Sequence, residues 1–107
     1  MRIFKKRTFD EAAKRYPNDA ASLSATYRLL DACEAMASSD LKRTFNTLDR
    51  FTPRSGWYVI DIGGNNLRLI AAIDFFKQLV FVKHIYSHAE YTRANKWYQI
   101  NTTGIRP

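Results

Sequence analysis

The chain has 107 residues, of which 46% are hydrophobic, and it carries a formal net charge of +7 at pH 7. This length suits one domain over residues 1–107 with one modest core. The hydrophobic content is too high for a disordered chain, and no apolar run reaches the roughly 18 residues that a membrane-spanning helix needs.

The excess of basic residues points to an acidic partner. The chain has 17 Lys and Arg residues against 10 Asp and Glu residues, which favours binding to nucleic acid, an acidic protein or a membrane surface. A charge that serves only solubility is the alternative. No apolar segment follows the basic N-terminus, so we expect no signal peptide. Cys33 is the single cysteine and cannot form an internal disulfide, which favours a cytoplasmic protein.

Helical patterns dominate the first half of the chain. Thr8 and Glu11 have the spacing of a capping box at the start of a first helix. Pro17 ends that helix or opens the next one, which is expected over about residues 19–36. A short third helix begins within residues 38–40. The side chains expected to face inward from the second and third helices are Leu23, Tyr27, Leu30, Cys33, Leu41 and Phe45.

The second half has the composition of β-strands. Strand-forming runs occur at Trp57–Ile62, Leu67–Phe75 and Leu79–Ile85, and the short turns between them predict an antiparallel meander. A short strand is also expected within residues 1–4. Helices first and strands afterwards predict an α+β fold, in which N-terminal helices pack on a C-terminal antiparallel sheet.

Alternation along these strands separates a packing face from a polar face. A hairpin turn centred on Gly64–Asn65 places Asp61 opposite Arg68, and a two-residue turn at Phe76–Lys77 sets the next pairing. The packing face then carries Tyr58, Ile60, Ile62, Leu67, Leu69, Ala71, Ile73, Val80, Val82 and His84. The opposite face carries Asp61, Arg68, Asp74 and Lys83 among Val59, Ile70, Ala72 and Phe81.

Arg68 and Lys83 interrupt apolar strands on the face that the core does not need. They form either a basic floor for a phosphate backbone, with Arg68 stabilising a pentavalent phosphorane, or an exposed sheet face whose cations extend into water. Asp61 is either a general base or, as we favour, the ion-pair partner that orients Arg68 across the hairpin.

His88 and Tyr91 follow the last strand at a spacing that points both side chains the same way from a helical turn. Histidine exchanges a proton near neutral pH, and a tyrosine hydroxyl donates or accepts a hydrogen bond at a reacting phosphate. The alternative is an exposed turn with Tyr91 packed on the sheet edge. Trp97 and Tyr98 are assigned to a polar tail, where they are exposed or covered by a partner.

We expect neither a metal nor a cofactor. His84 and His88 have the four-residue spacing of a ligand pair on a helix, but His84 is predicted to lie in a strand facing the core. Cys33 is too distant to make a convincing third ligand. Gly63–Gly64 lacks the surrounding residues of a phosphate-binding loop and is expected to form a turn.

Two motifs follow one another in the second half of the chain. G-G-N-x-L-R occupies residues 63–68, and H-x-E-Y occupies residues 88–91. Together with weaker similarity in residues 12–17 and 41–51, this ordered set resembles the HigB family of bacterial toxins, relatives of the RelE-like ribonucleases. The resemblance covers most of the chain.

The resemblance implies a RelE-like fold and an endoribonuclease that cleaves messenger RNA during translation on the ribosome. It implies metal-free chemistry, in which a 2′-hydroxyl attacks the adjacent phosphate. It also implies neutralisation by a cognate antitoxin with a helix-turn-helix domain, contact with operator DNA only through the toxin–antitoxin complex, and no membrane partner.

The resemblance assigns roles to particular residues. The catalytic candidates are His88, Tyr91, Arg68, Lys83 and Asp61. The RNA-binding candidates are Arg68, Lys83, Asn65 and Arg93. His88 and Tyr91 would exchange protons, and Arg68 would stabilise phosphate charge. Ser87 and Thr92 replace a threonine and an aspartate that are common in the family, so no role of that aspartate is carried over.

Two other functions remain open from the sequence. A non-catalytic module that binds RNA or the ribosome would explain the charge without requiring His88 or Tyr91. A subunit of an operator complex is the second, although no clear helix-turn-helix is visible and the isolated chain is not expected to bind DNA.

Overall fold

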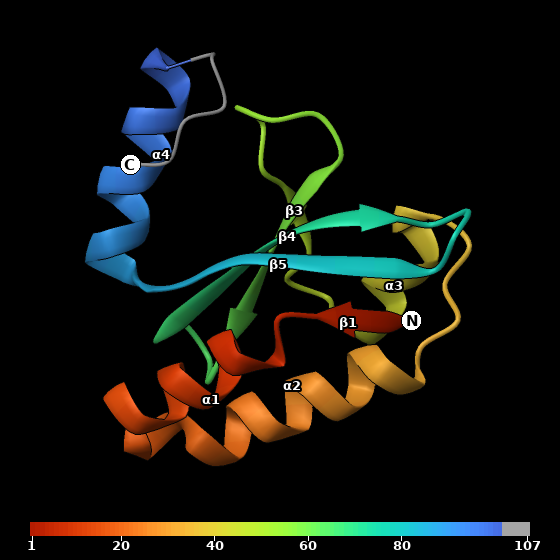
Figure 1. Cartoon of the computed structure of the whole chain (residues 1–107). Coiled ribbons are helices and arrows are strands. Elements are labelled where there is room, and N and C mark those ends of the chain that lie inside the picture. Colours follow the sequence, from red (N-terminus) through yellow and green to blue (C-terminus); the bar gives the residue numbers. More distant parts are fainter. Residues whose placement is uncertain (102–107) are drawn as a thin grey trace.

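One mixed β-sheet with helices on both of its faces makes up the structure, a computed structural model that describes residues 1–101 (Figure 1). The strands lie in the order β1-β5-β4-β3-β2. Their bounds are β1 (Arg2–Phe4), β2 (Asp49–Arg50), β3 (Trp57–Ile62), β4 (Leu67–Asp74) and β5 (Leu79–Ser87). The helices are α1 (Lys6–Arg15), the short 3-10 helix η1 (Pro17–Asp19), α2 (Ala20–Ala32), α3 (Ser38–Thr44) and α4 (His88–Ile100). The predicted α+β class is confirmed.

Helices α1 and α2 cover one face of the sheet, and α4 lies on the other side of it (Figure 1). The main core fills the space between the sheet and the α1–α2 layer. Its most deeply buried members include Leu23, Leu30, Leu41, Ile60, Ile62, Leu67, Leu69, Val80 and Val82. The inward residues predicted for α2 and α3 all belong to this core or pack against it. In the described part of the chain, no helix is both long and apolar enough to cross a membrane.

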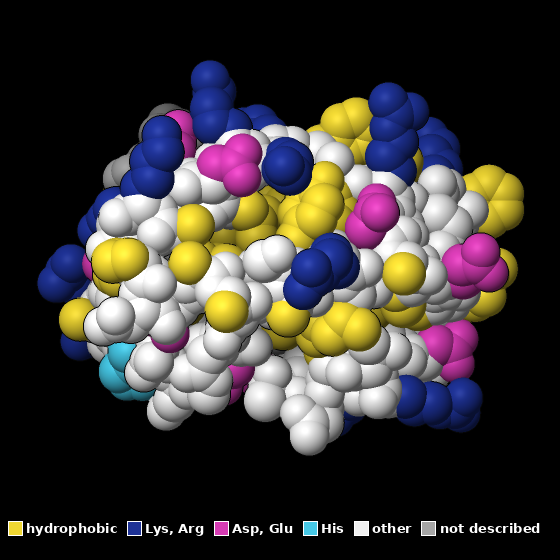
Figure 2. Space-filling model, turned by 90° about the horizontal axis from the view of Figure 1, so that it is seen from below, with side chains coloured by type: hydrophobic (Ala, Val, Ile, Leu, Met, Phe, Trp, Pro, Cys, Tyr) yellow, Lys and Arg dark blue, Asp and Glu magenta, His cyan; other side chains and the backbone are white. Residues whose placement is uncertain are grey.

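The outer surface of the α1–α2 layer has hydrophobic side chains among its charged ones (Figure 2). A groove runs between the two helices, with Phe9 and Ala13 on α1 and Leu23 and Tyr27 on α2 among its lining residues. The Phe9 and Tyr27 rings meet edge to face at 5.3 Å. This groove is therefore partly filled by the packing that joins the two helices.

The β3–β4 hairpin has the predicted register. Asp61 pairs with Arg68, and Ile62 pairs with Leu67. Gly63 and Gly64 both have positive φ, at 64° and 71°, which glycine adopts at little cost. A Cβ on Gly63 would lie 2.6 Å from Asp19 Oδ1, so the turn packs tightly against η1.

A β-bulge changes the second half of β5. Ala71 pairs with Val82 as predicted, but the next residue of β4, Ile70, pairs with His84, so Lys83 is the extra residue. One extra residue inverts the alternation of the strand beyond it. The prediction that His84 faces the main core is therefore wrong. Ile85 takes the core position, and His84 lies on the opposite face, with Nε2 2.8 Å from the Tyr98 hydroxyl.

The C-terminal segment is a helix rather than a polar tail. Ser87 and Glu90 form a capping box at the start of α4, where each side chain bonds the backbone amide of the other residue. Tyr98 is only 1% exposed, which corrects its assignment to an exposed or partner-covered position. It belongs to a second buried cluster, which consists of Phe51, Val59, Ile70 and Tyr98, with Trp57, Tyr86, Tyr91 and Trp97 packed against it.

The N-terminal region differs from prediction at three points. Helix α1 begins at Lys6, after Lys5 in a left-handed conformation, so Thr8 and Glu11 do not form its cap. Strand β1 was expected, but it pairs in parallel with β5, whereas the predicted sheet was antiparallel. Helix α2 ends at Ala32 because Cys33 is extended, and the N-terminal ammonium of Met1 donates to the carbonyls of Leu30 and Asp31 near that end.

Candidate functional site

The side chain of Arg68 is the centre of a polar cluster on the α4 side of the sheet. Its Nη2 lies 3.1 Å from Asn65 Oδ1 and 3.4 Å from His88 Nδ1. Its Nε lies 3.6 Å from Asp61 Oδ1, an ion pair too long for a hydrogen bond. The side chains of Arg68 and Asp61 are 20% and 22% exposed. The guanidinium is thus held from three sides while part of it still reaches solvent.

The ring of Tyr91 packs against the same guanidinium. The Arg68 Cζ atom lies 4.8 Å from the Tyr91 ring centroid, a cation–π arrangement. Burial raises the pKa of the Tyr91 hydroxyl; the charge of Arg68 lowers it, while Asp49 and Asp61 raise it, and the net shift is upward. Tyr91 is therefore protonated at neutral pH and can donate a hydrogen bond.

His88 is the first residue of α4 and is exposed at the rim of the cluster. Because Arg68 is a donor only, Nδ1 of His88 can face it only as an acceptor. In that arrangement the ring is neutral and Nε2 carries the proton. The imidazole is therefore placed to exchange a proton with a group that binds at the guanidinium.

Glu90 fixes the start of α4, and the sequence analysis gave it no role of its own. Its Oε1 accepts hydrogen bonds from the Ser87 amide at 2.9 Å and the Tyr16 hydroxyl at 2.8 Å, and its Oε2 pairs with Arg15 at 3.0 Å. Burial raises the pKa of Glu90, but these hydrogen bonds outweigh it and lower the pKa to about 2. The carboxylate thus ties α4 to the helical layer and holds His88 and Tyr91 in place. The S-x-x-E spacing of residues 87–90 was a signal that could have found it.

Asp49 is a second residue that the sequence analysis missed. It lies on β2 opposite Val59, and its charge contributes to the raised pKa of Tyr91. No local pattern indicated this, because a two-residue strand has too little alternation to be recognised.

Two of the predicted site residues lie outside the cluster around Arg68. The Lys83 ammonium lies 5.2 Å from the centroid of Trp57, the first residue of β3, whereas Asp61 is near the other end of that strand. Arg93 lines a hollow beside Tyr86 and Trp97. Residues two apart on a helix do not face each other, so Arg93 points away from Tyr91. The structure thus brings together Asp61, Asn65, Arg68, His88 and Tyr91.

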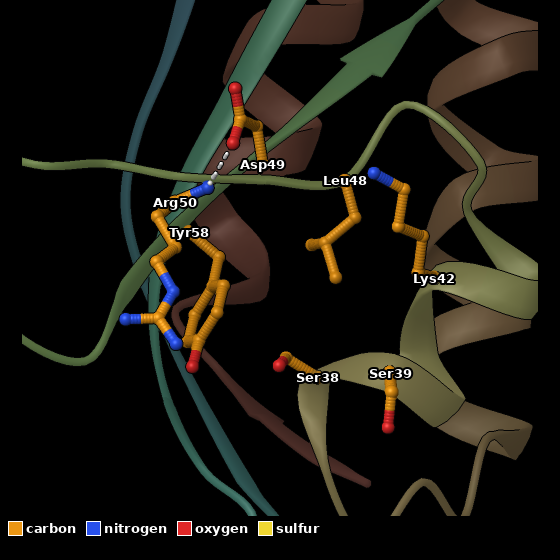
Figure 3. A pocket seen from close by; sticks show the side chains of 7 residues that line it. All are labelled: Ser38, Ser39, Lys42, Leu48, Asp49, Arg50 and Tyr58. Carbon is orange, nitrogen blue, oxygen red and sulfur yellow. Dashed lines mark hydrogen bonds between the residues drawn. The ribbon is translucent and has the colours of Figure 1, made fainter.

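A separate hollow opens on the other side of β2 (Figure 3). It is lined by Ser38, Ser39, Lys42, Leu48, Asp49, Arg50 and Tyr58. The side chains of Arg50 and Tyr58 lie next to each other at one side of it, and Lys42 faces it from α3 (Figure 3). Within residues 1–101, no group of three or more His, Cys, Asp and Glu side chains could hold a metal ion.

The cluster around Arg68 places a cation, the guanidinium, and a neutral hydrogen-bond donor, the Tyr91 hydroxyl, next to a histidine. Such an arrangement can neutralise an anionic group and exchange protons with it. The Asp61 carboxylate lies beside the buried Nε of Arg68, where it orients the cation. The chemistry suits an anionic ester such as a phosphodiester.

Comparison with known proteins gives one consistent family. The model of HigB toxins, described as the RelE-like toxic component of a toxin–antitoxin system, matches residues 19–94. The mRNA interferase HigB of Escherichia coli O6:H1 (strain CFT073) is 44% identical over 101 residues, which cover 94% of this chain and 98% of that protein. The mRNA interferase toxin HigB of Escherichia coli K12 is 29% identical over 91 residues, 85% of this chain and 88% of that protein. With the cluster around Arg68 wholly inside the matched region, the chain belongs to the HigB family of RelE-like toxins, the toxic components of toxin–antitoxin systems.

Proposed function

We propose that this toxin is an endoribonuclease that cleaves messenger RNA during translation on the ribosome, in the cytoplasm. The observation that carries the proposal is the contact of Arg68 with both His88 and Tyr91. The names of the relatives support it, because both compared HigB proteins are called mRNA interferases. The net charge of +7 suits a polyanionic substrate.

The proposed reaction needs no metal ion. The 2′-oxygen of one nucleotide attacks the adjacent phosphorus, the bond from phosphorus to the 5′-oxygen breaks, and a 2′,3′-cyclic phosphate forms. One proton leaves the 2′-hydroxyl and one reaches the departing 5′-oxygen. Arg68 stabilises the charge that develops on the phosphate.

Proton transfer is assigned to the two residues of α4. His88 takes the proton from the 2′-hydroxyl at Nδ1, once the substrate replaces the 3.4 Å contact of that nitrogen with Arg68 Nη2. Tyr91 is protonated and supplies a hydrogen bond or proton on the leaving side. Asp61 orients Arg68 through the ion pair, and Asn65 positions the same guanidinium. Lys83 and Arg93 serve as peripheral RNA contacts.

The toxin of a toxin–antitoxin system has an antitoxin as its partner. We propose that this antitoxin carries a helix-turn-helix domain and that operator DNA is bound only by the complex. The positive charge of the toxin predicts an acidic contact patch on the antitoxin.

Controlled expression tests the proposal. Wild type, His88→Gln and Lys14→Gln are induced without antitoxin, and 5′ ends of translated messages are mapped. Lys14 is an exposed residue of α1 and is not one of the five residues of the cluster. Wild type and Lys14→Gln should arrest growth and cut messages, and His88→Gln should do neither. If wild type arrests translation without new 5′ ends, the non-catalytic ribosome-binding function replaces this one; if His88→Gln cuts normally, the assignment of His88 is wrong.

A further inference from the structure

The strand β2 separates the cluster around Arg68 from the hollow lined by α3 and β3, and its two residues point to different sides. Asp49 lies at the edge of the hollow and accepts a hydrogen bond from the Arg50 amide at 2.8 Å, while Arg50 extends along the hollow (Figure 3). From this arrangement we propose that the hollow is a second RNA subsite, which binds a nucleotide flanking the cleaved phosphodiester. The choice of ligand rests on the proposed function.

The lining combines the groups that bind a nucleotide. Lys42 and Arg50 supply two cations for phosphate, Ser38 and Ser39 supply hydroxyls, and Tyr58 supplies an aromatic ring. Aromatic rings beside cations are typical of single-stranded RNA sites. The hollow has a volume of about 260 Å³, close to the lower end of small-molecule pockets at roughly 300 Å³. That size fits a nucleotide better than a folded segment of a protein.

The two cations are available to a ligand. Within residues 1–101, neither the Arg50 guanidinium nor the Lys42 ammonium has a carboxylate within 4.0 Å. By contrast, the neighbouring Arg43 pairs with Asp40 at 3.7 Å. The Asp49 carboxylate, which also lines the hollow, accepts a hydrogen bond from the Arg50 backbone amide. The lining therefore has a net positive charge, because the Lys42 and Arg50 cations outnumber the Asp49 carboxylate.

Tyr58 is held in position from behind. Its ring packs edge to face against Phe75, with centroids 5.6 Å apart and planes at 84°. It is partly buried and packs against the main core. A base that stacks on the remaining surface of this ring would meet a rigid partner, which lowers the entropy lost on binding.

The hollow lies across the β2 edge from the cluster around Arg68. Tyr58 and Asp61 are three residues apart on β3, which corresponds to about 10 Å along a strand. The Asp61 amide donates to Thr47 Oγ1 at 3.1 Å, and the segment from Thr47 leads directly into β2. A strand of RNA with one phosphate at Arg68 would cross the β2 edge and reach Arg50.

A binding measurement tests this subsite without relying on cleavage. The probe is a fluorescent single-stranded RNA hexamer with 2′-O-methyl riboses, which has no free 2′-hydroxyl to attack the phosphate. Fluorescence anisotropy compares wild type, the double variant Lys42→Gln/Arg50→Gln and the control Lys14→Gln/Arg28→Gln. The control removes the same charge from exposed positions on α1 and α2.

The subsite predicts a loss specific to the first double variant. Its Kd should rise about tenfold or more, and the dependence of log K on log salt should flatten by about 1.4, or 0.7 for each lost phosphate contact on a single strand. The control should keep the wild-type Kd within about threefold. Equal affinity of the two double variants, or a wild type that binds no better than Lys42→Gln/Arg50→Gln, overturns the subsite. The subsite is also overturned if Lys42→Gln/Arg50→Gln keeps the wild-type Kd for RNA and loses affinity only for the antitoxin. That result would assign the hollow to an acidic protein segment.

The outcome is separable from that of the proposed function. If messages are not cleaved but the hexamer binding depends on Lys42 and Arg50, the subsite stands and the nuclease fails. If messages are cleaved and the double variant behaves as the control does, the subsite alone fails.

Discussion

The guanidinium carbon of Arg68 lies 4.8 Å from the ring centroid of Tyr91, so the cation that would face a phosphate rests on an aromatic ring. The ring and the hydroxyl of Tyr91 therefore have different tasks, and substitution can separate them. Tyr91→Phe keeps the support and removes the hydroxyl. Cleavage of a translated message should fall by about 10²- to 10⁴-fold, the usual range for loss of a proton-transferring group. The free energy of unfolding should change by less than about 1 kcal/mol.

The matched control is Tyr27→Phe, because Tyr27 is also partly buried but lies in the α1–α2 layer. It should leave cleavage unchanged. Full activity of Tyr91→Phe would remove the hydroxyl from the reaction and leave Tyr91 as a support only.

Arg68→Lys tests whether geometry as well as charge is needed. Lysine keeps the positive charge but cannot present a planar group that stacks on Tyr91 and bonds Asn65 simultaneously. The single-turnover cleavage rate should fall by about 10²-fold or more, in line with loss of a group that stabilises transition-state charge. Arg28→Lys, on the exposed surface of α2, should retain a rate near that of wild type. Comparable losses in the two variants would contradict a special role for Arg68.

Glu90 predicts a pH dependence of stability. Its pKa of about 2 in the folded state lies below the ordinary glutamate pKa of 4.5, so its contribution to stability is fully present above about pH 4.5 and is lost as the pH falls towards 2. Glu90→Gln retains an amide for the capping box but loses the charge that Tyr16 and Arg15 engage. It should lower the free energy of unfolding by about 1–2 kcal/mol at pH 7.

Urea unfolding between pH 2.5 and 7 measures this difference. The curves of wild type and Glu90→Gln should converge as the pH falls below 4.5. Parallel curves over the whole range would show that the Glu90 charge does not stabilise the fold.

The two glycines of the β3–β4 turn allow a steric effect to be isolated. Both have positive φ, but a Cβ on Gly64 meets open space, whereas one on Gly63 would lie 2.6 Å from Asp19 Oδ1. Gly64→Ala should cost only the strain of the left-handed conformation, about 1–2 kcal/mol. Gly63→Ala should cost more, because Asp19 must also move and its hydrogen bond from Asn66 is disturbed. Thermal unfolding measures the loss of stability in each variant. Equal losses would mean that Asp19 moves aside at no cost.

The hairpin that carries Asp61 and Arg68 could be predicted because its information is local. Two adjacent glycines fix the turn, and strict alternation on both sides fixes which side chains share a face. The grouping of His88 with Arg68 depended on the family motifs, since neither spacing nor composition indicates how the end of β5 returns across the sheet.

Other features were invisible because tertiary contacts decide them. Helix α4 has a weak amphipathic pattern, and Tyr98 is buried through its contacts with Phe51 and Trp57 rather than through periodicity. No glycine or proline lies near Lys83 to indicate a bulge there. Strand β2 has two residues, so only its pairing with β3 defines it.

That bulge lets one strand serve two interiors. Before the bulge, Val80 and Val82 point into the main core. After it, Ile85 points into the main core, while His84 contacts Tyr98 on the opposite face of the sheet. Removing the one extra residue would leave the composition of β5 almost unchanged yet exchange inside for outside along its last four positions. The register of β5 beyond the bulge therefore determines whether α4, which carries His88 and Tyr91, can pack on this face of the sheet.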